Sequence, residues 1–156
     1  MFALVTSLGA CWLAPALAGS SISPPASSSR FEDTASHVHV VGAARISSDE
    51  DQLAVTLAID PGFHINANPA SSDFLIPTVL NVSELKPLRI AYPEPIRFKP
   101  KFTEDMIDVY NGTILITAFF PKGTLLAFTA LHGSVTAQAC TDQFCLPPAE
   151  LPLTTE

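Results

Sequence analysis

The chain has 156 residues, with 8 basic residues against 15 acidic ones, and its net charge is −7 at pH 7. This length suits one domain with a sizeable core, and the acidic balance, without any cluster of Lys and Arg, speaks against nucleic acid as a partner. The 14 prolines outnumber the 7 glycines, and the many Val, Ile, Thr and Phe residues are typical of strands separated by stiff turns. The composition therefore predicts an all-β protein.

The first 18 residues carry no charged side chain and end in Ala16-Leu17-Ala18, the small-x-small pattern that signal peptidase cleaves. We expect export and cleavage after Ala18. An alternative is a lipoprotein signal, because the run LGAC resembles a lipobox that would make Cys11 the lipidated first residue and tether the protein to a membrane. Both alternatives place the rest of the chain in the periplasm or otherwise outside the cytosol, where disulfides persist.

Residues 19–36 are rich in Ser and Pro and lack apolar periodicity, which predicts a flexible tether followed by a domain at 37–156. In that domain, short apolar or alternating runs are separated by turn signals. We expect strands at 37–46, 52–59, 77–82, 88–92, 113–120, 125–131 and 134–139. Strands at this spacing predict an immunoglobulin-like β-sandwich.

Two segments break this rhythm. Residues 60–77 mix Gly, Asn, Pro and aromatic residues, so we expect a strand that breaks into an ordered loop. Residues 92–110 are too rich in proline for a central strand, whereas Asn111-Gly112 directly after them predicts a tight turn. Because long ordered loops on a sandwich often carry the function, both segments are candidate parts of a site.

Cys140 and Cys145, in the run QACTDQFCLPP, are the only cysteines beyond the leader. A disulfide between them closes a short loop, so it would stabilise the fold by only about 2 kcal/mol through the restraint that it places on the unfolded chain. The same spacing lets the two sulfurs join and separate without moving the rest of the fold. The pair is therefore either a redox couple or the structural disulfide of a binding or scaffold module.

Three segments in this order resemble the family of periplasmic N-terminal domains of the thiol:disulfide interchange protein DsbD: HINANPASSDFLIPT, YPEPIRF with the later VYNG, and QACTDQFCLPP. The resemblance covers most of residues 40–153. It implies an immunoglobulin-like sandwich that relays reducing equivalents between a membrane-embedded thiol reductase and thioredoxin-fold proteins, as a protein-disulfide reductase component. Because the sequence holds neither the membrane-spanning nor the thioredoxin-like portion of DsbD, we expect both partners to be met in trans.

The resemblance also assigns site positions. The redox pair is Cys140 and Cys145, and the proline pair after it is Pro147 and Pro148. The aromatic residue of a loop that caps the cysteines is Phe102. His64 and Asn66 match two positions, on a strand beside the cysteines, that hold tyrosines in better-known members. It further implies that Cys145 forms the mixed disulfide and that Cys140 resolves it. The chain departs from the enteric proteins in a cysteine spacing shorter by one residue and in Ala137, which replaces a tyrosine.

A copper site is the other chemistry that a β-sandwich with Cys and His suggests. Blue-copper centres need two His, one Cys and a weak axial ligand, usually Met. No His or Met follows Cys140, and Met106 is the only Met beyond the leader, so we expect no metal and no other cofactor. Nothing near the pair in sequence supplies a cation that would lower a thiol pKa, so activation is expected from His64 or from the partner.

Overall fold

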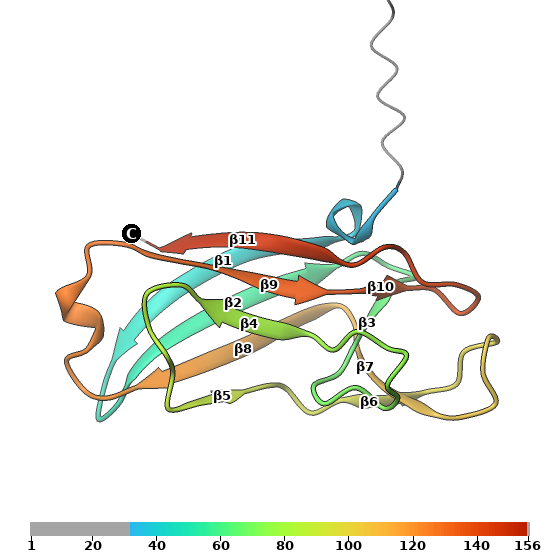
Figure 1. Cartoon of the computed structure of the whole chain (residues 1–156), viewed down its shortest axis with the longest axis horizontal. Coiled ribbons are helices and arrows are strands. Elements are labelled where there is room, and N and C mark those ends of the chain that lie inside the picture. The colour runs from blue at the N-terminus through green and yellow to red at the C-terminus, as the bar shows by residue number, and fades with distance from the viewer. Residues whose placement is uncertain (1–31, 156) are drawn as a thin grey trace, which may run out of the picture. The chain divides into compact units, whose positions relative to one another are not determined.

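The structure is a computed structural model that describes residues 32–155. The cleavage and lipidation sites expected at Ala18 and Cys11 lie outside the described residues, as does most of the expected tether. The described part consists of β-strands in three antiparallel sheets, with two short 3-10 helices. This confirms the predicted all-β, immunoglobulin-like sandwich (Figure 1).

Two of the sheets form the sandwich. Sheet A has the order β1-β2-β8-β5, and sheet C has the order β11-β9-β4. The strands of sheet A are β1 (Val38–Ser47), β2 (Asp51–Ile59), β8 (Thr113–Phe120) and β5 (Arg89–Ala91). The strands of sheet C are β11 (Ala149–Thr155), β9 (Leu131–Ala137) and β4 (Val79–Val82).

The main core lies between sheets A and C. Along β2 and β8 every second residue is buried, as expected where one face of a strand packs inward. The largest side chains that are fully buried in this core include Leu53, Leu57, Ile116, Phe120 and Leu131. Alternating apolar residues in the sequence therefore set which face of each strand lies inside.

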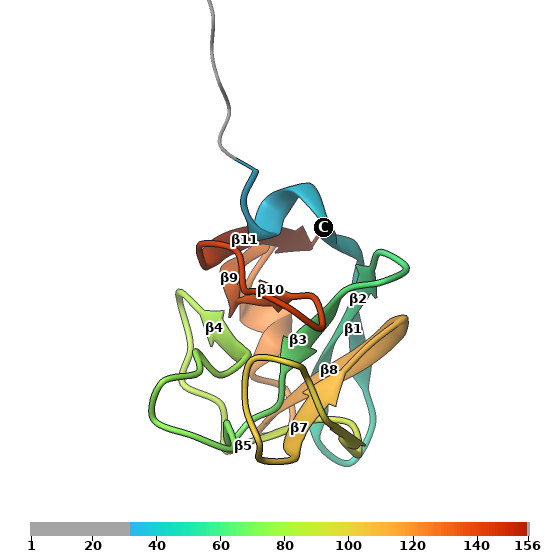
Figure 2. The same ribbon diagram turned by 90° about the vertical axis from the view of Figure 1, so that its right-hand side faces the viewer.

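The third sheet, sheet B, lies at one end of the sandwich and has the order β10-β3-β7-β6. Its strands are β10 (Ala139–Cys140), β3 (His64–Asn66), β7 (Ile107–Tyr110) and β6 (Ile96–Phe98). β3, β7 and β10 are short strands that lie next to β2, β8 and β9 in the chain and are separated from them by one to four irregular residues, as the end view in Figure 2 shows. The tight turn expected at Asn111-Gly112 is wrong: β7 and β8 do not pair with each other, and these two residues form a bend between them, where Gly112 has φ +64°.

The strand expected at 125–131 is wrong in its first part. Leu125–Ala127 form the 3-10 helix η2, and strand β9 begins only at Leu131. Asp51 is buried and its Oδ2 accepts a hydrogen bond of 2.9 Å from the backbone N–H of Leu125, which fixes the start of the helix. A short apolar run does not by itself distinguish a strand from a helical turn, and here a distant carboxylate selects the turn.

Two strands lie in or directly after proline-rich sequence. The segment 92–110 contains β7, which lies between β3 and β6 in sheet B and carries no proline of its own. β11 was not expected at all, although it holds Pro152 on the edge of sheet C, a position where the missing N–H of a proline costs no ladder bond. At the other end, residues 34–36 were assigned to the tether but form the 3-10 helix η1 (Thr34–Ser36).

Candidate functional site

Cys140 and Cys145 form a disulfide across a tight hairpin at the end of sheet B, with an S–S distance of 2.04 Å and a Cα–Cα distance of 3.9 Å. The two residues face each other as an isolated antiparallel bridge. On either side, the N–H of Thr141 donates to the carbonyl of Phe144 and the N–H of Leu146 donates to that of Ala139, both at 2.8 Å. The cysteines therefore occupy a non-hydrogen-bonded pair, the position at which antiparallel strands bring side chains closest.

The turn of this hairpin is held by the hydroxyl of Thr141. Its Oγ1 accepts hydrogen bonds of 3.2 Å from the backbone N–H groups of Gln143 and Phe144. Such local side-chain bonds stabilise turns without help from the rest of the fold. None of these hydrogen bonds involves sulfur, so none of them depends directly on the S–S bond.

The two cysteines differ in exposure. Cys140 is fully buried, with 0% of its surface exposed, and lies directly opposite His64 of β3 in the sheet. Cys145 is half-buried, lies at the outer edge of the hairpin, and is followed by the exposed Pro147 and Pro148. The prolines supply no backbone donors, so a regular ladder does not extend along this edge.

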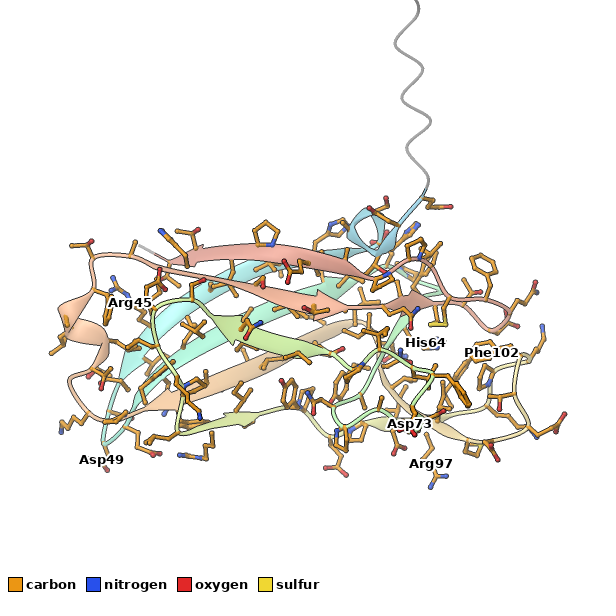
Figure 3. The ribbon with its side chains drawn as sticks, in the orientation of Figure 1. Arg45, Asp49, His64, Asp73, Arg97 and Phe102 are labelled. Carbon is orange, nitrogen blue, oxygen red and sulfur yellow. A yellow bond between two sulfur atoms is a disulfide. The ribbon has the colours of Figure 1, made fainter. Side chains whose placement is uncertain are left out.

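His64 is buried against both the hairpin and β6. Its ring lies 4.6 Å from that of Phe98 and is tilted by 52°, and Nε2 is buried without a hydrogen-bond partner. Burial lowers the pKa of His64 below its usual value, so the imidazole is neutral at pH 7. Figure 3 shows His64 at the end of the sandwich where the yellow disulfide bond lies.

Asn66, the other strand position assigned to the site, holds a loop in place. Its Nδ2 donates to the carbonyl of Ile76 at 3.0 Å and to Oε1 of Gln138 at 3.4 Å. Gln138 lies at the break between β9 and β10, and its Nε2 donates to the carbonyl of Leu146 at 3.3 Å. These amides connect the loop after β3 to the cysteine hairpin. Gln138, the first residue of the run QACTDQFCLPP, is therefore a further residue of the site.

Thr34 of η1 holds both strands of the hairpin, and nothing in the sequence indicated that it belongs to the site. Its hydroxyl donates to the carbonyl of Pro147 at 2.8 Å and accepts from the N–H of Ala139 at 2.9 Å. Thr34 is fully buried, although it stands in a segment whose composition is that of a linker. No pattern around Thr34 in the sequence signals these contacts, because its partners lie more than 100 residues away, at separations of 105 and 113.

Phe102 lies in the cap loop, residues 99–106, which connects β6 to β7 and lies at the same end of the sandwich as the hairpin (Figure 3). The loop is joined to the hairpin turn by Lys101, whose N–H donates to the carbonyl of Asp142 at 2.6 Å and whose Nζ pairs with the carboxylate of Asp142 at 2.5 Å. Phe102 is 40% exposed and lines a cavity of about 420 Å³ between the cap loop and residues 71–75. The structure thus brings the cap loop against the cysteine hairpin.

Sheet B has two different faces. Ile65, Tyr110 and Ala139 point into the main core, whereas Cys140 and its cross-strand neighbour His64 belong to the other face. That other face is also buried, but its residues are not part of the main core cluster: Cys140, His64, Asn66, Ile107 and Val109. The disulfide therefore lies in a small second layer of its own.

Among residues 32–155, no group of three or more His, Cys, Asp or Glu side chains is arranged to hold a metal ion. The same residues include no helix that is long and apolar enough to cross a membrane.

Comparisons with known proteins identify the family and the fold. The family model described as thiol:disulfide interchange protein DsbD, N-terminal, matches residues 33–154. The reduced DsbD N-terminal domain of Neisseria meningitidis is 14% identical with a TM-score of 0.52, over 73% of this chain and 82% of that one. The N-terminal periplasmic domain of ScsB from Proteus mirabilis is 15% identical with a TM-score of 0.53, over 75% of this chain and 46% of that one. No curated protein matches; at these identities the two structures support the fold alone.

Proposed function

The chain belongs to the family of DsbD N-terminal domains, and we propose that it is an extracytoplasmic thiol–disulfide exchange domain whose reactive pair is Cys140 and Cys145. The observation that carries the proposal is the hairpin itself. Backbone hydrogen bonds on both sides of the pair hold the cysteines opposite each other in addition to the S–S bond, and one cysteine is buried while the other is half-buried. A pair held in this way can open and close without unfolding its surroundings.

The exchange proceeds in two displacements. A thiolate of the partner attacks Sγ of Cys145, the S–S bond breaks, and Cys140 leaves as a thiolate. A second thiolate of the partner then attacks the partner's sulfur in the mixed disulfide. The partner's own disulfide forms, and the domain is released as a dithiol carrying two electrons. The reverse sequence passes those electrons on, so a membrane-embedded thiol reductase and a thioredoxin-fold acceptor met in trans would suffice as partners.

The N-terminal part of the chain fits this location. We propose that residues 1–18 direct export, with cleavage after Ala18 or lipidation of Cys11, and that the following segment up to the residues near Thr34 connects the domain to that point. Both arrangements leave the cysteine pair outside the cytosol, where a disulfide persists until a dedicated reductant reaches it.

A redox titration separates exchange from a purely structural bridge. We expect a reduction potential within the range of the oxidoreductases, between about −120 and −270 mV, when the domain is equilibrated with glutathione or dithiothreitol buffers. A structural disulfide resists the glutathione pool and has a potential below about −300 mV. A value in that lower range would leave a binding or scaffold module as the function.

Reduction should cost little stability. Because the disulfide closes only a short loop, we expect the free energy of unfolding to fall by no more than about 2 kcal/mol on reduction. Chemical denaturation with and without dithiothreitol, followed by circular dichroism, measures the difference. Cooperative unfolding of the reduced domain in the absence of denaturant would contradict a pair that cycles.

The cap has a test of its own. Phe102 is a large apolar side chain in the loop that Lys101 ties to the hairpin, so Phe102→Ala should speed alkylation of the reduced cysteines by a small reagent while barely changing the melting temperature. Leu126→Ala is the matched control, because Leu126 is also exposed but lies in η2, away from sheet B. Equal alkylation rates in the Phe102 and Leu126 variants would contradict a cap at this position.

A further inference from the structure

The buried cysteine poses a problem of proton transfer. When the domain closes its disulfide, Cys140 must attack as a thiolate, yet Cys140 is fully buried and burial raises the pKa of a thiol. Loss of its proton directly to water is therefore slow at pH 7. A neighbouring group that can accept a proton would remove this barrier.

His64 has the position and the chemistry for that task. It is the residue of β3 directly opposite Cys140, and side chains of directly opposed residues project from the same face with Cβ atoms about 4.5–5.5 Å apart. Nε2 of His64 is buried and has no hydrogen-bond partner. Buried polar atoms are nearly always paired, so an unpaired ring nitrogen in the residue opposite a reactive cysteine calls for a functional explanation.

The surroundings of His64 keep it ready to accept a proton. A cavity of about 400 Å³ adjoins His64, and among the residues that line it the only charged one is Asp142. The carboxylate of Asp142 is already paired with Lys101, and Phe98 covers the ring with an apolar face. No unpaired carboxylate in that lining holds the imidazole protonated, in agreement with its lowered pKa.

We propose that His64 accepts the proton of the Cys140 thiol as Cys140 closes the mixed disulfide. The proton passes from Sγ of Cys140 to Nε2 of His64, the thiolate attacks Sγ of Cys145, the Cys140–Cys145 bond forms, and the partner's sulfur leaves as a thiolate. In the opposite direction the imidazolium returns the proton to the departing sulfur of Cys140. This inference rests on the exchange function proposed above and adds a catalytic base to it.

The experiment uses the reduced protein and dithiobisnitrobenzoate, which releases one coloured thiolate at each of two steps. The rate of the first release depends on reagent concentration and reports attack by the half-buried Cys145. The rate of the second release does not depend on that concentration and reports closure by Cys140. We expect His64→Gln and His64→Tyr to slow the second phase about 100-fold at pH 7, the lower end of what a positioned base contributes. The first phase should change by less than about threefold.

The pH profile separates a base from a structural role. Wild-type closure should vary little between about pH 7 and 8, because burial lowers the pKa of His64 and its ring is neutral there. Closure in the variants should rise about tenfold per pH unit, following thiol ionisation alone. His132→Gln, which replaces an exposed histidine of β9, is the matched control and should behave as wild type.

Three outcomes decide the matter. Slow, pH-dependent closure in both variants supports His64 as the base, with tyrosine preserving a ring against Phe98 where glutamine does not. Closure at the wild-type rate and with the wild-type pH profile in either variant overturns the inference but leaves the exchange function standing. Absence of a second, concentration-independent release in the wild-type protein would instead overturn the exchange function itself.

Discussion

The Cys140→Ser protein should trap a thioredoxin-fold partner as a covalent mixed disulfide, and the Cys145→Ser protein should not. Cys145 is half-buried at the outer edge of the hairpin, whereas Cys140 is fully buried and lies between Cys145 and His64 of β3. After Cys145 the chain continues through Pro147 and Pro148, which lack backbone donors and leave the edge open to an approaching loop. With Cys140 removed, nothing in the domain resolves the complex that Cys145 forms.

The partner in this experiment is a thioredoxin-fold protein that keeps only its exposed cysteine, activated as a mixed disulfide with a small aromatic thiol. Release of that thiol gives the rate, and non-reducing electrophoresis with mass spectrometry gives the yield and the linked cysteine. We expect near-complete trapping for Cys140→Ser and none for Cys145→Ser, with the double variant as the blank. Trapping by Cys145→Ser alone would reverse the two roles, and trapping by neither would favour a structural bridge.

The sandwich was largely predictable because strand periodicity is a local property. β2 and β8 alternate strictly between buried and more exposed residues, and that alternation is written in their sequences. η2 was mistaken for a strand because the carboxylate of Asp51 that fixes it comes from a distant strand. No strand was expected at β11, which holds Pro152, and its place at the edge of sheet C makes that proline compatible with a strand.

The residues of the candidate site could be proposed from the sequence, whereas most of their arrangement could not. The cysteine pair and the residues around it could be assigned from their resemblance to a family, and the structure brings the hairpin, β3 and the cap loop together. The resemblance places His64 on a strand beside the cysteines, but its position directly opposite Cys140 follows from the register between two strands far apart in the chain. Register depends on every pairing in the sheet, so no motif around either residue predicts it.

The close approach of β4 to β9 gives the largest expected effect on stability. Gly133 lies in β9 between Leu153 of β11 and Val82 of β4. A Cβ at Gly133 would lie 2.2 Å from the carbonyl oxygen of Asn81, a backbone atom that cannot rotate away. Gly133→Ala therefore forces β4 to move outward and weakens its pairing with β9.

We expect Gly133→Ala to lower the free energy of unfolding by about 3 kcal/mol or more, the upper range for a steric insertion, and the melting temperature by about 10 °C. Gly42→Ala is the matched control, because the atoms nearest its added Cβ belong to Thr56 at 3.8 Å, an ordinary contact. Alanine there should change stability by less than about 1 kcal/mol.

Because Gly133 lies at the start of β9 and the cysteine hairpin follows the other end, disulfide closure below the melting temperature should proceed at the wild-type rate in both variants. Similar melting of the two variants would contradict the close packing of β4 on β9, and slowed closure in folded Gly133→Ala would show that the hairpin depends on β4.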